Sequence, residues 1–134
     1  MVLRALLLDY AGVLTDVGAQ RLYAAVRIAR AHGVRTALLS NAGGGPEARE
    51  AFGDRFDAVV FSGDVGVAKP DVAVYRLTAD RLGVTPGECV FVDDSAVNVA
   101  GAVSAGMVGV RHVSVAETLA ELEALFPFSV SGSG

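Results

Sequence analysis

The sequence predicts an α/β fold: a three-layer, doubly wound arrangement in which helices cover both faces of a five-stranded parallel sheet. Short apolar runs alternate with longer stretches of helical period along the chain. Glycines follow three of the helical stretches, and prolines or serines stand where others begin. Strands that alternate with helices in this way are joined by right-handed crossovers. Ligands of such folds bind in the crevice beyond the carboxyl ends of the strands.

Five apolar runs predict the strands, and they span residues 2–8, 36–39, 58–61, 89–92 and 107–110. Five segments of helical period predict the helices, and they span residues 19–31, 46–52, 70–82, 95–105 and 115–126. The expected helix stops are Gly33, Gly83 and Gly106. The expected helix starts are Pro46 and Pro70 at first helical positions, and Ser95 and Ser114 as caps.

The bulk composition predicts one domain, residues 1–128, followed by a disordered tail, residues 129–134, which is rich in Ser and Gly. Apolar residues make up 52% of the chain, yet no run reaches the ~20 residues of a membrane span. The start has no pattern of a secretion signal, so we expect a cytoplasmic protein. The net charge of −4 without a basic cluster argues against a nucleic-acid partner.

Polar residues stand at the ends of the predicted strands. Asp9 closes the first strand, Ser40 and Asn41 close the second, and Lys69 opens the third helix. The pair Asp93-Asp94 closes the fourth strand. Because the carboxyl ends of parallel strands share one edge, we expect these side chains to face the same rim.

These residue types suit phosphoryl chemistry with a divalent cation. Asp9, Asp93 and Asp94 would repel one another unless a hard cation neutralised them, and Mg²⁺ is the natural occupant. Lys69 can balance a phosphoryl group and hold Asp9 ionised, while Ser40 and Asn41 offer hydrogen-bond donors to its oxygens. The alternative for Asp93-Asp94 is that one caps the next helix and the other is solvated.

Other polar and reactive residues have ordinary structural interpretations. Cys89 is the only cysteine, so it has no partner for a disulfide, and it is expected in the core. The run 43–45 is all glycine, but it lacks the motif of a P-loop, so we expect a flexible loop. His32 and His112 have no visible partner in the sequence and are interpreted as structural.

The order Asp9, Ser40, Lys69, Asp93-Asp94 resembles the four motifs of the haloacid dehalogenase superfamily, whose phosphatases form an aspartyl-phosphate. The resemblance spans residues 3 to about 113 and is strongest in two strings, FSGDVGVAKP (61–70) and VFVDDS (90–95). It implies a Rossmann-like core. A receiver domain has similar architecture, but its acidic residues occur in the reverse order, so that alternative fails.

The resemblance also implies roles for single residues. Asp9 would be the nucleophile and a metal ligand, Ala11 would give Mg²⁺ its backbone carbonyl, and Asp94 would bind the metal with Asp93 beside it. The phosphoryl group would be held by Ser40, Asn41 and Lys69.

The chain departs from the family pattern at two points. Phosphatases of the family usually carry a second Asp two residues after the nucleophile as the general acid and base, and here that position is Ala11. The chain also has no room for a cap domain between Asp16 and the second strand, or between Asn41 and Ala58. We therefore expect a bare core with an open site, closed, if at all, by a macromolecular substrate or a neighbouring subunit.

The leading function is a magnesium-dependent phosphoester hydrolase with a phosphorylated small molecule or macromolecule as substrate. The main alternative is a catalytically inactive member of the fold that serves as a binding or assembly module. A third is that Ala11 replaces an original Asp in order to trap a complex. The apolar residues near the C-terminus are expected to cover the core, with a second copy in a homo-oligomer as the alternative.

Overall fold

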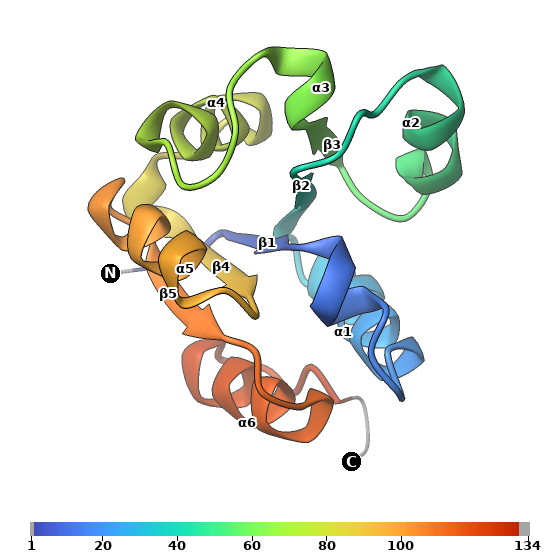
Figure 1. Cartoon of the computed structure of the whole chain (residues 1–134). Coiled ribbons are helices and arrows are strands. Elements are labelled where there is room, and N and C mark those ends of the chain that lie inside the picture. The colour runs from blue at the N-terminus through green and yellow to red at the C-terminus, as the bar shows by residue number, and fades with distance from the viewer. Residues whose placement is uncertain (1, 132–134) are drawn as a thin grey trace.

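One parallel sheet runs through the middle of the molecule, with the strand order β3-β2-β1-β4-β5 (Figure 1). In this computed structural model, which describes residues 2–131, the strands are β1 (Ala5–Leu8), β2 (Arg35–Ser40), β3 (Ala58–Phe61), β4 (Cys89–Asp93) and β5 (Val108–Arg111). All four pairings are parallel, as predicted. The strand order reverses at β1, and a doubly wound sheet opens its ligand crevice at such a point.

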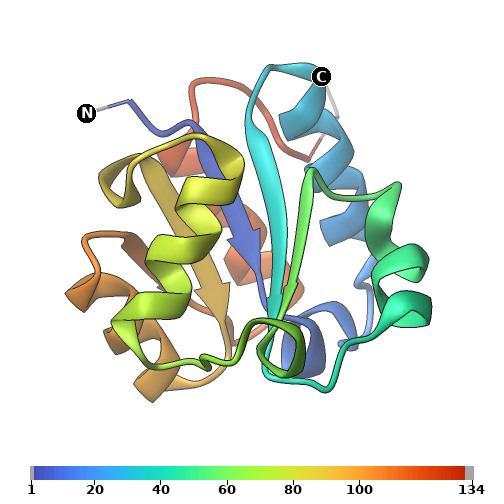
Figure 2. The same ribbon diagram turned by 90° about the horizontal axis from the view of Figure 1, so that it is seen from above.

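Helices cover both faces of this sheet, so the predicted three-layer α/β fold is confirmed (Figure 2). The helices are α1 (Gln20–Ala31), α2 (Pro46–Gly53), α3 (Ser62–Val65), α4 (Val72–Leu82), α5 (Ala96–Ser104) and α6 (Val115–Leu125). Two short turns, η1 (Tyr10–Leu14) and η2 (Pro86–Glu88), complete the chain. The sequence pattern did not predict α3, η1 or η2, because segments this short show no helical period.

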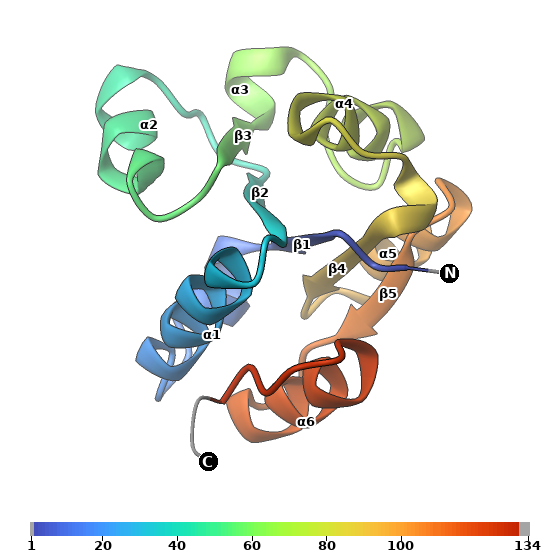
Figure 3. The same cartoon turned by 180° about the vertical axis from the view of Figure 1, so that it is seen from behind.

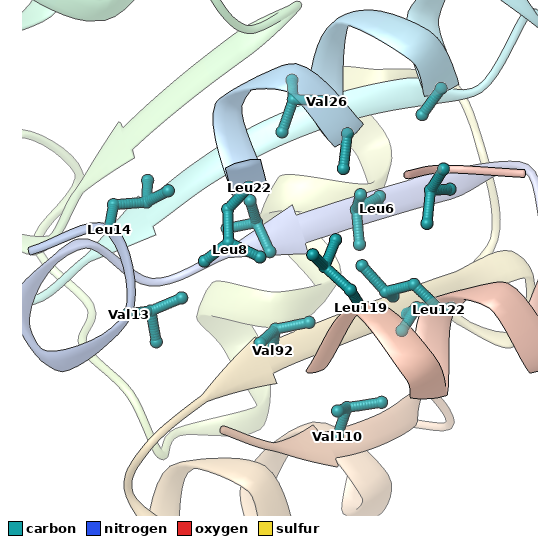
Figure 4. Packing of buried hydrophobic residues seen from close by; sticks show 14 of the residues in the cluster. Leu6, Leu8, Val13, Leu14, Leu22, Val26, Val92, Val110, Leu119 and Leu122 are labelled. Carbon is teal, nitrogen blue, oxygen red and sulfur yellow. The ribbon is translucent and has the colours of Figure 1, made fainter. Parts of the chain in front are cut away.

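Two separate apolar layers hold the helices on the sheet. Alternate residues of a strand point to opposite faces, so Leu6 and Leu8 of β1 face α1 and α6, while Ala5 and Leu7 face α4 and α5. Figure 4 shows the first layer, where Leu22 of α1 meets β1. Burial of these aliphatic side chains is the main stabilising contribution to the fold, at roughly 1.5–3 kcal/mol for each fully buried one.

The helix ends follow the local signals of the sequence. Ser95 and Ser114 accept hydrogen bonds from backbone amides of the first turns of α5 and α6. Gly33, Gly83 and Gly106 have positive φ just after α1, α4 and α5. The predicted start at Pro70 is two residues early, because the side chain of Asp71 accepts from Ala73 N and caps α4 there.

The segment after α6, through Val130, packs back against the first apolar layer and runs alongside α6 (Figure 3). Val130 is completely buried, and Ser129 and Ser131 donate hydrogen bonds to the Glu123 carboxylate. These three residues belong to the stretch 129–134 that the sequence predicts as a disordered tail. The expectation for 132–134 lies outside the described residues. Among residues 2–131, no helix is long and apolar enough to cross a membrane.

Candidate active site at the carboxyl edge of the sheet

The predicted polar residues meet at the carboxyl edge of the three central strands. Asp9 follows β1 directly, and β1 lies between β2, which ends at Ser40, and β4, which ends at Asp93. One carboxylate oxygen from each of Asp9, Asp93 and Asp94 lies within 4.8 Å of the other two. The sheet topology therefore brings these carboxylates together, as the sequence predicts.

Lys69 lies at the centre of this cluster, and its side chain is 1% exposed. Its Nζ donates to Asp9 Oδ1 at 2.8 Å, to Asp93 Oδ2 at 2.9 Å and to the Leu39 carbonyl at 3.0 Å. An ammonium group has three N–H donors, so all of them are used. Lys69 thus contributes a fixed positive charge beside Asp9.

Asp93 is fully buried and accepts hydrogen bonds on both of its oxygens. Besides Lys69, it accepts from the Ser95 amide at 2.9 Å and from Asn98 Nδ2 at 3.2 Å. Asn98 stands in the first turn of α5, and its carbonyl accepts from the Tyr75 hydroxyl at 2.6 Å. The carboxylate of Asp93 therefore orients Lys69 while it remains within reach of a shared cation.

Asn41 is placed beside the backbone of Lys69. Its Oδ1 accepts from Lys69 N and its Nδ2 donates to the Lys69 carbonyl, both at 2.9 Å. The sequence predicts Asn41 as a side-chain and backbone donor to phosphoryl oxygens, and this stays a prediction: the pair of bonds uses Oδ1 and one of the two N–H donors of Nδ2. No feature of the sequence announces this contact, because the two residues lie 28 positions apart.

Burial raises the pKa of Asp9 above its ordinary value of 3.8, and the charge of Asp93 adds to this rise. The hydrogen bond and the charge of Lys69 lower the pKa and oppose these effects. A carboxylate in this environment is less well solvated than one in water. Lys69 therefore favours the ionised form of a carboxylate whose burial favours the protonated form.

The chain turns sharply after Asp9, in η1. Gly12 has φ +85°, which only glycine adopts easily, and a Cβ there would lie 2.3 Å from Asp94 Oδ2. The backbone at Gly12, directly after Ala11, thus approaches the Asp94 carboxylate closely. Ala11 and Asp94 are both exposed, so this half of the site is open to solvent.

The glycine run after β2 is tied to α3. The Gly45 amide donates to Asp64 Oδ1, Arg49 forms an ion pair with the same carboxylate, and the Gly63 amide donates to the Ala42 carbonyl. A Cβ on Gly63 would lie 2.3 Å from the Gly43 carbonyl oxygen, so the two segments touch through their backbones. The sequence predicted a flexible loop here, and the structure shows a loop that is held to α3 by hydrogen bonds at Ala42 and at Gly45.

His112 has partners that the sequence did not reveal. Its side chain is 2% exposed, its Nδ1 lies 2.6 Å from Thr118 Oγ1, and its Nε2 lies 2.9 Å from Asp16 Oδ2. The hydrogen bond from His112 lowers the pKa of Asp16. Its amide also donates to the Asp93 carbonyl at 2.8 Å. His112 therefore joins the loop after β1 to α6 and β4, a structural role.

Comparisons with known proteins agree on one family. A family model described as haloacid dehalogenase-like hydrolase matches residues 19–106. The matched stretch contains Ser40, Asn41, Lys69 and the pair Asp93-Asp94, and begins after Asp9 and Ala11. A phosphatase from Mycobacterium tuberculosis is 39% identical over 88 residues, which cover 62% of this chain and 41% of that protein.

Solved structures show the same fold. An uncharacterized protein from Corynebacterium glutamicum superposes with a TM-score of 0.86 at 40% identity, over 92% of this chain and 94% of the other. A HAD family enzyme from Bacteroides thetaiotaomicron, in complex with magnesium and inorganic phosphate, superposes with a TM-score of 0.57 over 72% of this chain and 53% of that one. At 20% identity this second likeness concerns the fold alone. The chain spans 10% to 41% of the length of the curated relatives it matches.

Proposed function

Because this chain belongs to the haloacid dehalogenase-like hydrolase family, we propose that it hydrolyses phosphate esters with Mg²⁺ through an aspartyl-phosphate on Asp9. The observation that carries the proposal is the buried ammonium of Lys69, hydrogen-bonded to both Asp9 and Asp93. This arrangement keeps a nucleophilic carboxylate ionised at the crevice of a doubly wound sheet.

The donor set fits a hard divalent cation. Asp9, Asp93 and Asp94 offer carboxylate oxygens within 4.8 Å of one another, and among residues 2–131 Lys69 is the only cation that forms an ion pair with these oxygens. Asp9 and Asp94 would hold Mg²⁺ with the backbone carbonyl of Ala11, while Asp93 is shared with Lys69. When bound, Mg²⁺ supplies positive charge that balances the transferring phosphoryl group.

The residues of the chain then divide the work of phosphoryl transfer. Asp9 attacks phosphorus, Lys69 keeps its carboxylate ionised, and Asn41 holds the backbone of Lys69 in place. Ser40 ends β2 at the same edge and is 6% exposed, so its hydroxyl is our candidate donor to a phosphoryl oxygen. The substrate is a phosphorylated small molecule or an exposed phosphoryl group on a macromolecule.

Release of nitrophenol from p-nitrophenyl phosphate tests this proposal. We expect turnover with Mg²⁺, none above background with EDTA, and a loss of at least ~10³-fold in Asp9→Asn. Asp80→Asn, on the exposed end of α4, is the matched control and should behave as the parent protein. Equal rates for the parent and Asp9→Asn would overturn the proposal.

A second candidate function rests on Ala11. A site without an acid at this position can bind phosphate and Mg²⁺ and yet not turn over, which would make the protein a binding module. In that case Mg²⁺ and phosphate would raise the melting temperature, whereas p-nitrophenyl phosphate would not be cleaved even at high protein concentration.

A further inference from the structure

Departure of an alcohol from a phosphate ester is helped by a proton donor, which is worth about 10²- to 10⁴-fold in rate. The side chains that most readily carry a transferable proton near neutral pH are His and Cys, and Lys where its pKa is lowered. This chain has two histidines, one cysteine and one lysine, so each can be located.

Neither histidine is available to the site. His112 has Thr118 on one ring nitrogen and Asp16 on the other. His32 follows α1 and precedes β2, at the amino end of the strands, where its ring stacks on Phe128 at 4.2 Å. The carboxyl end, where Asp9 stands, is the opposite edge of the sheet.

The cysteine and the lysine are also unavailable. Cys89 begins β4, pairs with Ala5 at the amino end of β1, and is fully buried, which raises its pKa to about 12. Lys69 uses its three N–H groups on Asp9, Asp93 and the Leu39 carbonyl.

The carboxyl groups flanking the site do not hold a proton either. The pKa of Asp16 is lowered by His112, and that of Asp64 is lowered by Arg49. Position 11, beside the nucleophile, carries only a methyl group. Tyr10 has a hydroxyl, and its ring packs edge-on against Phe52 at 5.3 Å. Because this hydroxyl is a remaining candidate proton donor, the experiment below includes a Tyr10 variant.

We infer, resting on the function proposed above, that the site is matched to phosphoryl groups on leaving groups that depart as stable anions, namely acyl phosphates and aryl phosphates. In the first step an oxygen of Asp9 bonds to phosphorus, and the bond from phosphorus to the leaving oxygen breaks. The electron pair stays on the carboxylate or phenolate that leaves, so no proton has to be supplied. Phosphate esters of aliphatic alcohols lack this advantage.

The second step releases Asp9. Water attacks phosphorus, the bond to the Asp9 oxygen breaks, its electron pair returns to the carboxylate, and the proton of the water passes to solvent at the open half of the site. With no base beside it, this step is slow. The first turnover should therefore appear as a burst of leaving group, about one per protein chain.

The experiment compares kcat/KM for acetyl phosphate, a series of phenyl phosphates with increasingly acidic phenols, and glycerol phosphate. We expect kcat/KM to fall by at least ~10²-fold from nitrophenyl to glycerol phosphate. Ala11→Asp should recover most of that loss for glycerol phosphate and change the aryl substrates little. Ala11→Asn introduces a side chain of the same size as Asp that cannot donate a proton in this way. It should recover none of the lost kcat/KM for glycerol phosphate.

Two controls separate this inference from the function on which it rests. If Asp9→Asn keeps the activity on every substrate, the proposed function itself is wrong. If activity depends on Asp9 but glycerol and nitrophenyl phosphate react equally well, the inference is wrong and the function stands. A selective loss of glycerol phosphate cleavage in Tyr10→Phe would also overturn it, because Tyr10 would then be the missing donor.

Discussion

On one side of Asp9 stand Lys69 and Asp93, buried and joined by hydrogen bonds, and on the other side stand Ala11 and Asp94, exposed to solvent. The buried side is fixed by β2, β4 and α5 together, since its side chains also bond to the Leu39 carbonyl and to Asn98. The open side consists of the turn η1 and of Asp94 after β4, and the two segments come close at Gly12.

The two sides of Asp9 differ in what they can supply: the buried side supplies a positive charge, and the open side lacks a proton donor. The buried side holds a permanent cation beside a carboxylate, which is what a phosphoryl acceptor needs. In the function that we propose, the open side would hold the cation and the leaving group, and it has no proton donor at position 11. The proposed site would thus have the charges that phosphoryl transfer needs but lack a general acid.

Lys69→Met should have the largest effect on the buried side. The substitution leaves Asp9 and Asp93 buried without their counter-ion, which costs about 3–5 kcal/mol. Urea unfolding at pH 7 in EDTA measures this loss, and Arg76→Met on the exposed face of α4 is the control, expected within ±0.5 kcal/mol. A loss below about 1 kcal/mol would mean that the cluster is not held by this charge.

Gly101→Ala should have the next largest effect, because α5 packs there against the residue after Lys69. A Cβ at Gly101 would lie 2.5 Å from the Pro70 carbonyl oxygen. Overpacking of about 1–3 kcal/mol outweighs the helix-propensity gain of about 1 kcal/mol.

The matched control for this substitution is Gly53→Ala, where no atom lies within 4 Å of the added Cβ. It should be neutral or slightly stabilising, by about 0.4–1 kcal/mol. Thermal unfolding of both variants makes the comparison, and equal melting temperatures would contradict the close contact between α5 and Pro70.

Asp9→Asn should have the smallest effect on stability, and its sign is the informative part. Because the pKa of Asp9 is raised in the folded protein, the native state binds more protons than the unfolded state above pH 3.8. The contribution of Asp9 to stability is therefore present at low pH and is lost as the pH rises through its native pKa.

At pH 7 in EDTA we expect Asp9→Asn to be more stable than the parent, on the order of 0.5–1 kcal/mol. The gap should close as the pH falls toward 3.8. Urea unfolding from pH 4 to 7 measures this trend. A variant that is less stable at pH 7, with a gap that widens with pH, would show that Lys69 outweighs the burial of Asp9.

The sheet and the main helices were predictable because their signals are local. Apolar runs such as 58–61 match β3 residue for residue, and Gly83 ends α4 where its positive φ is needed. The position of Asp9 at the carboxyl rim follows from its place directly after a strand of a parallel sheet. Tertiary contacts were not predictable in this way, because the bond between Asp16 and His112 joins residues 96 positions apart.

Among the site residues, too, local features could be predicted from the sequence and tertiary contacts could not. Residue type and strand position suffice to select Asp9, Lys69 and Asp93 as candidates. Residue type and strand position do not reveal that the side-chain amide of Asn41 forms two hydrogen bonds with the Lys69 backbone. Nor do they reveal that all three N–H donors of Lys69 are occupied. Hydrogen bonding is a property of the packed structure, so only the structure shows that Asn41 contacts the backbone of Lys69.

The central claim is that Asp9 accepts a phosphoryl group, and a trapped intermediate tests it most directly. The protein is mixed with acetyl phosphate and Mg²⁺, quenched in acid within the burst phase, and weighed by intact-mass and peptide mass spectrometry. We predict a mass increase of one phosphoryl group, located on Asp9 and absent in Asp9→Asn. A burst without added mass, or a phosphoryl group on another residue, would contradict the account.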